Sequence, residues 1–254
     1  MRADRAEAVG SVHHVTLDHW SRGASALHRR DPRVKIVSVL VFLVVLATAH
    51  RELAWLGAAL FTVLCVAAWQ ARLPLRGALV RAGVVLPFTL VFAAASWLAG
   101  DPARGAILVM KSYLSALAVL LLVSTTPLPL LLRGFEMTGV PRFLLMVAQF
   151  LYRYLFVISE EAQHMRKAAL ARGATVGGLA GNAARFRAAA GALAVLFARS
   201  YARAGEIHRA MLARGFPGYF RPLIELHFHR GDVMFVILGV LTPVALRVLI
   251  ERVA

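Results

Sequence analysis

Long apolar runs separated by short polar linkers fill the first half of the chain. Four of these runs approach the length of a membrane span, at residues 34–49, 53–69, 84–98 and 106–123. A helix needs about 20 mostly apolar residues to cross a hydrocarbon layer about 30 Å thick. A fifth run, at residues 233–249, contains Pro243, which a membrane helix tolerates when neighbours bond the freed carbonyl. The pattern predicts an all-α, multi-pass membrane protein with about five transmembrane helices.

The segment at residues 127–230 differs because basic residues interrupt its apolar stretches. The run at 140–159 is apolar enough to be a sixth span, and that alternative stays open. Arg153 opposes it, since an arginine at mid-bilayer costs roughly 2.5–3.5 kcal/mol on insertion scales. The helical pattern also continues past this run through Glu160 and Glu161. We interpret the segment as a cytoplasmic helical domain on the inner membrane face, with apolar faces buried against one another and against membrane-embedded partners.

The charges in the linkers predict the orientation of the spans. The linkers are expected at residues 50–52, 72–81 and 100–102. Basic residues gather before the first span and in the second linker, so the positive-inside bias places the N-terminus in the cytoplasm. The predicted organisation is a cytoplasmic tail, a four-helix transmembrane region, a cytoplasmic helical domain and a last transmembrane helix, at residues 1–30, 31–126, 127–230 and 231–254.

Composition supports this organisation once the charge is seen to be segregated. The 254 residues are 59% hydrophobic, yet the formal net charge is +16. Apart from Lys35 at the very start of the first run, two cations fall in predicted spans: Lys111, whose stem can snorkel to the interface, and Arg247 on the predicted external side. Cys65 is the single cysteine, so it forms no internal disulfide. The first thirty residues hold no apolar signal-peptide region, and no basic strip interleaved with aromatics predicts a nucleic-acid partner.

One internal repeat stands out, at an offset of 42 residues. The stretch 167–173 matches 209–215 at five identical positions, and a sixth keeps its positive charge. Each copy is predicted to end a long amphipathic helix, with a glycine where a helix C-terminus favours a left-handed residue. The repeated triplets are Ala171-Arg172-Gly173 and Ala213-Arg214-Gly215.

These triplets are suited to entering a groove on another protein. Alanine and glycine add little bulk, and arginine presents five fixed donors to carboxylates or carbonyls. The plainer interpretation is that each arginine caps its own helix carbonyls and each glycine stops its helix. We prefer the groove interpretation because the motif occurs twice in one predicted domain. Two copies indicate two equivalent sockets, and therefore a dimeric or pseudo-dimeric partner.

The paired Ala-Arg-Gly ends resemble the coupling helices of T components, the transmembrane coupling subunits of energy-coupling-factor transporters. Four further stretches resemble the cobalt-type member of that family, CbiQ. They are residues 27–35 (LHRRDPRVK), residues 139–142 (GVPR), residues 152–154 (YRY) with Glu160 and Glu161, and residues 200–215. The resemblance covers roughly residues 20–250. The paired motif is specific for T components, whereas the assignment to the cobalt or nickel branch is weaker.

The resemblance implies an ATP-driven uptake complex in a bacterial cytoplasmic membrane. Its expected partners are two ABC-type ATPase subunits, membrane lipid and a substrate-binding membrane subunit (S subunit) that captures cobalt or nickel. Arg172 would occupy a groove in one ATPase and Arg214 the equivalent groove in the other. The chain itself is expected to bind no cofactor, because ATP is bound by the ATPases. A T component of a vitamin importer and a stand-alone permease remain alternatives.

The residues exclude several kinds of chemistry. None of the three lysines follows a glycine as a phosphate-binding loop requires, and zinc-protease and nucleophile-elbow motifs are absent. No predicted span has an acidic residue in its interior, which argues against an independent ion-coupled carrier. We therefore predict a non-catalytic subunit.

Two smaller features leave choices open. The face formed by Ala188, Ala189, Gly191 and Ala192 could admit a partner helix, but plain core packing is the preferred interpretation. Histidines gather near both ends, and imidazole suits borderline metals. A transient metal site is one interpretation, and scattered interfacial histidines are the simpler one, so we predict no bound metal. These histidines are His13, His14, His19, His28, His227 and His229.

Overall fold

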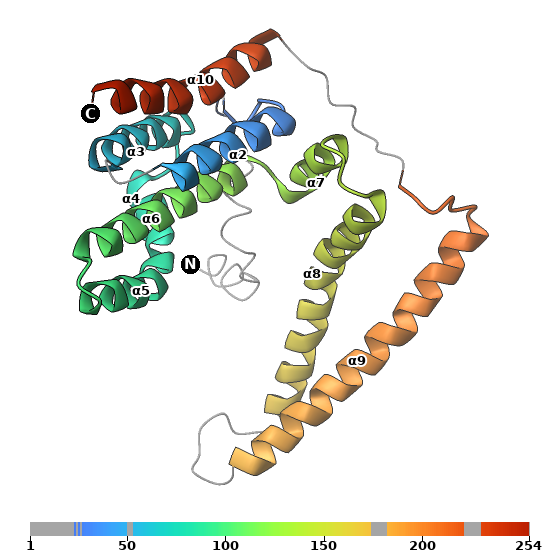
Figure 1. Cartoon of the computed structure of the whole chain (residues 1–254). Coiled ribbons are helices and arrows are strands. Elements are labelled where there is room, and N and C mark those ends of the chain that lie inside the picture. Colours follow the sequence, from blue (N-terminus) through green and yellow to red (C-terminus); the bar gives the residue numbers. More distant parts are fainter. Residues whose placement is uncertain are drawn as a thin grey trace, which may run out of the picture. The chain divides into compact units, whose positions relative to one another are not determined.

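The computed structural model describes residues 23, 25, 27–49, 53–173, 182–220 and 230–253, and all regular secondary structure among them is helical (Figure 1). The predicted all-α class is thereby confirmed. The elements are α2 (Pro32–Thr48), α3 (Leu53–Gln70), α4 (Leu75–Ala82), the 3₁₀ turn η2 (Gly83–Val85), α5 (Leu86–Leu98), α6 (Pro102–Thr125), α7 (Leu128–Met137), α8 (Arg142–Ala171), α9 (Asn182–Ala213) and α10 (Arg230–Val253).

The helices form two compact units. The first comprises Met1–Gly139 with Glu225–Ala254, and the second comprises Val140–Ile224. The predicted cytoplasmic domain at 127–230 was defined by its side of the membrane. Its boundaries stay a prediction, and so does the membrane-facing role given to it.

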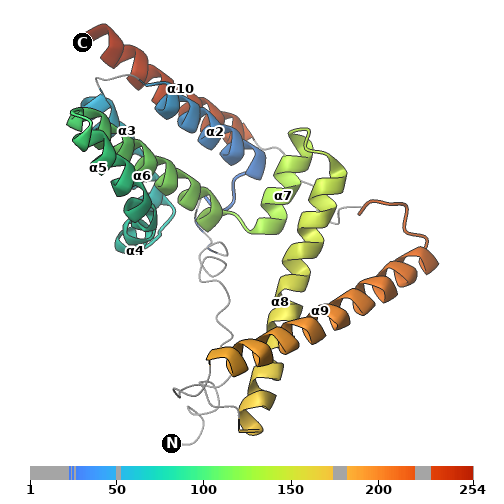
Figure 2. The ribbon, with the colours of Figure 1, turned by 60° about the horizontal axis from the view of Figure 1, so that its bottom comes forward.

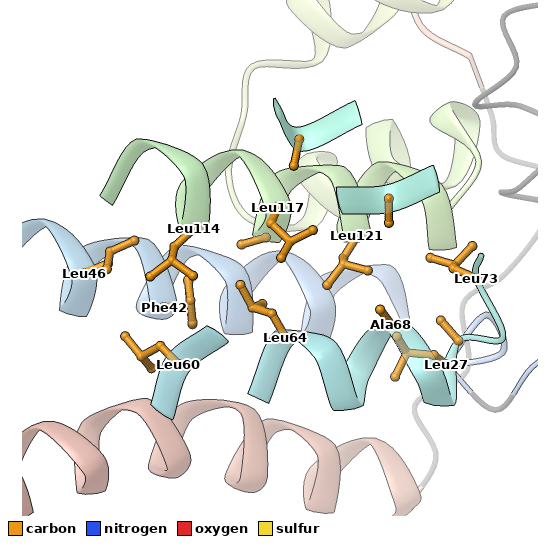
Figure 3. Packing of buried hydrophobic residues seen from close by; sticks show 14 of the residues in the cluster. Leu27, Phe42, Leu46, Leu60, Leu64, Ala68, Leu73, Leu114, Leu117 and Leu121 are labelled. Atoms are coloured by element: carbon orange, nitrogen blue, oxygen red, sulfur yellow. The ribbon is translucent and has the colours of Figure 1, made fainter. Parts of the chain in front are cut away.

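In the first unit, α6 lies at the centre and packs against α2, α3, α4 and α5. The C-terminal helix α10 returns to lie beside α2, as Figures 1 and 2 both show. Leucines from several helices interlock in the core (Figure 3), and Leu46, Leu60, Leu114 and Leu117 are almost fully buried. Burial of such side chains stabilises each by about 1.5–3 kcal/mol relative to exposure.

Two Asp-Pro pairs begin the helices that dominate this unit. Asp31 Oδ1 accepts a 2.9 Å hydrogen bond from the backbone N–H of Arg33 at the start of α2. Asp101 Oδ1 accepts a 3.1 Å bond from the N–H of Arg104 at the start of α6. In both helices a proline takes the first position, where its missing N–H would have no intrahelical partner. The sequence therefore fixes these two boundaries locally.

Glycine permits close helix approach at two crossings of the first unit. A Cβ on Gly105 of α6 would lie 2.9 Å from the backbone oxygen of Ala93 in α5. A Cβ on Gly239 of α10 would lie 2.6 Å from the Oγ of Ser38 in α2. Real Cβ atoms do not tolerate such distances, so both helix pairs need glycine where they cross.

Four stretches among the described residues are long and apolar enough to cross a membrane: Leu75–Leu98, Pro102–Thr125, Arg142–Ala171 and Gly231–Ile250. With their apolar surfaces, they confirm a multi-pass membrane protein. Helix α2 has only 17 residues, about 26 Å at 1.5 Å per residue. The described apolar part of α3, Trp55–Gln70, is also shorter than a full span. Helix α8 qualifies by length and composition, so a sixth crossing at 140–159 remains open.

The predicted linker at 72–81 is wrong in its second part. Helix α4 begins at Leu75 and, with η2 and α5, extends the third apolar stretch toward the N-terminus by several residues. The two arginines in this stretch suggested a polar loop. Instead α4 buries Ala78 and Ala82 on one side, which an amphipathic helix can do while keeping Arg76 exposed.

Lys111 and Arg247, which both lie within predicted spans, bind the same helix end, and this was not foreseen. Lys111 Nζ of α6 donates to the backbone oxygens of Ala47, at 3.0 Å, and Ala49, at 2.8 Å. Arg247 of α10 donates to the backbone oxygen of Thr48 at 3.3 Å and also bonds its Oγ1. The last carbonyls of a helix have no intrahelical partner and carry partial negative charge. Lys111 therefore caps α2 rather than only snorkelling, and Arg247 is held by the same helix end.

Candidate functional site

The second unit is built around the two longest helices of the described chain. Helix α8 has 30 residues and α9 has 32. They cross each other (Figure 2), and an ion pair between Glu161 of α8 and Arg199 of α9 joins them. Both views place the C-terminal end of α8 and the C-terminal end of α9 at different ends of this crossed pair. The structure therefore does not bring the two Ala-Arg-Gly triplets together.

Each triplet lies at a helix C-terminus, as the sequence predicted. Gly173 and Gly215 adopt left-handed backbone with φ of 85° and 71°. The N–H of Gly173 donates to the oxygen of Leu170 at 3.0 Å, and that of Gly215 donates to the oxygen of Leu212 at 2.9 Å. The two ends thus share one backbone geometry, which glycine adopts without the steric cost that a Cβ brings.

At the second end, the residue after the glycine completes a Schellman cap, whereas the corresponding residue after Gly173 lies outside the described part of the chain. The N–H of Phe216 donates to the oxygen of Met211 at 3.0 Å, five residues back. Together with the Gly215 bond, this satisfies two carbonyls of the last turn from outside the helix. The chain leaving α9 is therefore turned sharply at Gly215, and the direction of the following residues is fixed by backbone bonds.

The arginine side chains of both triplets are available to a partner. Arg172 and Arg214 are exposed, as are the alanine and glycine on either side of each. Among the described residues, neither guanidinium makes a hydrogen bond or an ion pair. The plainer interpretation, in which each arginine caps its own helix, is therefore not realised by these side chains. The glycines do stop the helices, and the arginines remain unpaired.

Sequence reasoning missed an aromatic cluster beside the second triplet. The rings of Phe216 and Phe220 lie 5.2 Å apart, and Phe220 lies 5.2 Å from Phe150 of α8. The guanidinium of Arg142, the first residue of α8, lies 5.7 Å from the ring centre of Tyr219. The signal was present in the sequence as three aromatic residues within five positions after Gly215. No periodic pattern connects them to α8, so only the structure reveals the contact.

The apolar faces of the long helices are not buried against one another, so that part of the sequence expectation is wrong, while their burial against membrane-embedded partners stays a prediction. Leu145 is the only buried residue of α8. Leu151, Leu155 and Leu193 keep more than half of their surface exposed. The small-residue face at Ala188, Ala189, Gly191 and Ala192 is likewise exposed rather than packed in a core. Two helices that cross at one point cover little of each other's surface, so these faces stay open.

The predicted histidine positions fall largely outside the described residues. These are His13, His14, His19, His227 and His229, while the described His28 accepts or donates a 2.7 Å bond with Ser25 Oγ. Among the described residues, no three histidine, cysteine or acidic side chains gather into a group that could hold a metal ion.

The fold and the site define a multi-pass, all-helical membrane protein that exposes two arginine-bearing helix ends. The family model described as cobalt transport protein, CbiQ, matches residues 23–225. The chain belongs to the CbiQ family, and so to the T components of energy-coupling-factor transporters.

Three relatives agree with this assignment. An energy-coupling factor transporter transmembrane protein EcfT from Acidaminococcus fermentans is 31% identical over 80% of this chain and 84% of its own length. The EcfT of Bacillus selenitireducens is 29% identical over 94% of this chain and 97% of its own. The cobalt transport protein CbiQ of Rhodobacter capsulatus is 34% identical, over 48% of each chain.

Proposed function

We propose that this chain is the coupling subunit of an ATP-driven importer for cobalt or nickel. It transmits the motion of two ABC-type ATPases to a separate S subunit in the membrane. The observation that carries the proposal is the pair of matching helix ends, each with an exposed arginine that has no partner in the described chain. A guanidinium kept free beside alanine and glycine is suited to a charge-assisted bond with a carboxylate on another protein.

The mechanism is mechanical. Arg172 docks in a groove of one ATPase and Arg214 in the equivalent groove of the other. When ATP draws the two ATPases together, it changes the distance between the two helix ends. Helices α8 and α9 cross and are joined by the Glu161–Arg199 ion pair. A displacement of one helix end therefore moves both helices together. Their exposed apolar faces then convey the movement to the S subunit and the surrounding lipid.

The cargo is assigned from the cobalt branch of the family. The family model and the relative from Rhodobacter capsulatus carry cobalt transport in their names, whereas the two EcfT relatives name no cargo. The residues that capture the ion belong to the S subunit, and ATP is bound by the ATPases, so this chain holds no cofactor. A vitamin importer with the same coupling residues is the alternative cargo assignment.

The chain works in a bacterial cytoplasmic membrane with its N-terminus in the cytoplasm. The positive-inside bias supports this orientation. In the same orientation, Arg172 and Arg214 face the compartment that contains ATP. A stand-alone permease would instead use neither arginine for attachment.

The test is a pull-down in mild detergent with tagged wild-type chain and the Arg172→Ala/Arg214→Ala double variant. We expect an ABC-type ATPase with the wild type and strongly reduced recovery with the double variant. Truncating one side of a desolvated charge pair at an interface costs about 2–5 kcal/mol. Lys167→Ala and Arg209→Ala, each five residues earlier on the same helix, are matched controls that should retain the ATPase. Full recovery with the double variant would refute the coupling role of the triplets.

A further inference from the structure

The two repeated helix ends match up to the glycine and differ completely after it. The residues after Gly173 are Ala-Thr-Val-Gly-Gly, at 174–178. The residues after Gly215 are Phe-Pro-Gly-Tyr-Phe, at 216–220. If each end bound its partner through the arginine alone, the second end would need no aromatic segment. The difference in sequence indicates that the Arg214 end presents aromatic residues that the five positions after Gly173 do not supply.

The residues after Gly215 are held in place by α8. The ring of Phe220 contacts both Phe216 and Phe150, and Tyr219 lies beneath the guanidinium of Arg142. Gly218, with φ of 88°, makes the second turn that brings Tyr219 and Phe220 back toward α8. Aromatic pairs at such separations stabilise a conformation beyond what their buried area contributes. The segment therefore has a defined conformation before any partner binds.

This arrangement forms a pocket of about 480 Å³ beside Arg214, and the pocket is open to the surface. Its walls come from the last turn of α9 and the folded-back segment: Met211, Arg214, Gly215, Phe216, Pro217, Tyr219 and Phe220. Among the described residues that line it, Arg214 supplies the only formal charge. The pocket therefore combines apolar and aromatic walls with one unpaired cation at its edge.

We propose that this pocket is a second docking element at the Arg214 end, which makes that end the stronger and more selective of the two attachments. It receives an apolar side chain of one ABC-type ATPase, next to the carboxylate that pairs with Arg214. The occupant follows from charge complementarity at the guanidinium, from the apolar walls and from continuity with the Arg214 contact. The inference rests on the proposed function.

A preformed pocket favours this role for a physical reason. Ordering side chains at an interface costs conformational entropy, and a surface that is already ordered avoids much of that cost. Aromatic and arginine side chains that fill or line pockets dominate interface energies. The Arg214 end has both an ordered surface and a pocket lined by aromatic and arginine side chains. Its contribution to the affinity for the ATPase should therefore exceed that of the Arg172 end.

The experiment measures affinity in detergent between the full chain and the ABC-type ATPase that co-purifies with the wild type, prepared separately. The variants are Tyr219→Ala, which opens the pocket, and Met211→Trp, which fills it. Tyr219→Phe keeps the ring, and Tyr201→Ala removes an exposed tyrosine of α9 outside the pocket. We expect about tenfold weaker binding for the first two, as loss of an interface hot spot gives, and wild-type affinity for the others. Circular dichroism and thermal melting verify that each variant is folded.

Arg172→Ala and Arg214→Ala, compared singly, test the asymmetry, and the larger loss is expected for Arg214→Ala. Wild-type affinity of Tyr219→Ala and Met211→Trp, with loss in Arg214→Ala, would overturn the pocket while leaving the proposed function standing. Equal losses for the two arginines would overturn the asymmetry. A wild-type chain that binds no ATPase would overturn the proposed function itself. A Tyr219→Ala defect seen only in nanodiscs of anionic lipid would assign the pocket to a lipid headgroup and refute the proposal.

Discussion

The ammonium group of Lys35, near the start of α2, donates a 3.0 Å hydrogen bond to the backbone oxygen of Thr125, the last residue of α6. It also donates to Oγ1 of Thr126 at 2.9 Å. Lys35 is 4% exposed, and the carboxylates of Asp31 and Asp232 lie near enough to attract it. A single buried cation thus fixes the corner where α6 ends and the chain continues to α7.

Replacing Lys35 by methionine is expected to destabilise the first unit. Methionine has a similar length but no donors, so the carbonyl of Thr125 and the hydroxyl of Thr126 lose their buried partner. Each polar group left unsatisfied costs about 1–3 kcal/mol, and two buried carboxylates lose a nearby positive charge. Thermal melting in detergent measures the effect, with Lys167→Met on exposed α8 as the matched control. Equal melting temperatures for the two variants would show that the Lys35 bonds contribute nothing.

Gly105 tests the close crossing of α5 and α6. The Cβ of Gly105→Ala would meet the backbone oxygen of Ala93 at 2.9 Å, so the helices must separate. We expect a loss of about 1–3 kcal/mol, typical of overpacking in a well-packed interior. Gly191→Ala on α9 is the control, since nothing lies within 4 Å of its Cβ and alanine favours a helix by about 1 kcal/mol. The prediction is wrong if both substitutions shift the melting temperature in the same direction.

Gly215 tests whether the left-handed cap matters to the second helix end. An alanine at φ of 71° is expected to cost about 1–2 kcal/mol. The last turn of α9 should then fray, and Arg214 and the pocket should lose their fixed geometry. Hydrogen–deuterium exchange of residues 207–216 measures the fraying. Gly205→Ala, in the interior of the same helix, should slow exchange there instead; unchanged exchange near Gly215→Ala would contradict the cap argument.

Lys111 and Arg247 should act on the stability of α2 as a coupled pair. Both donate to carbonyls of its last residues, Ala47, Thr48 and Ala49. When Lys111→Met is made alone, Arg247 still neutralises the helix end, and the reverse holds. We therefore expect the double variant to lose an amount of folding free energy that differs from the sum of the two single losses by about 0.5–3 kcal/mol. Strict additivity in thermal melting would show that the two cations act independently.

Much of the fold follows from local features of the sequence. The predicted runs at 34–49, 53–69, 106–123 and 233–249 correspond to α2, α3, α6 and α10, because a long apolar run has no other stable state in lipid. Asp31 and Asp101, each followed by proline, set helix starts by capping nearby N–H groups. Gly173 and Gly215 end α8 and α9 because glycine adopts the left-handed backbone that stops a helix without the steric cost of a Cβ.

Tertiary structure decided the rest, since the deciding contacts join residues far apart in the chain. Whether the arginines near α4 belonged to a loop or a helix depended on Ala78 and Ala82 finding a surface to pack on. Lys35 and Lys111 look alike as cations at apolar runs, yet one binds the end of α6 and the other the end of α2.

The two Ala-Arg-Gly ends show the same division most clearly. Their matching caps were determined by seven residues of sequence, because a helix stop is made within one turn of the chain. Their sequences differ after the glycine, but the structure that the second segment forms was decided by the fold. The aromatic segment after Gly215 becomes a pocket only because Phe150 and Arg142 of α8, some seventy residues earlier, hold Phe220 and Tyr219. A helix cap can be predicted from neighbouring residues in the sequence, but a pocket held in place by a distant helix cannot.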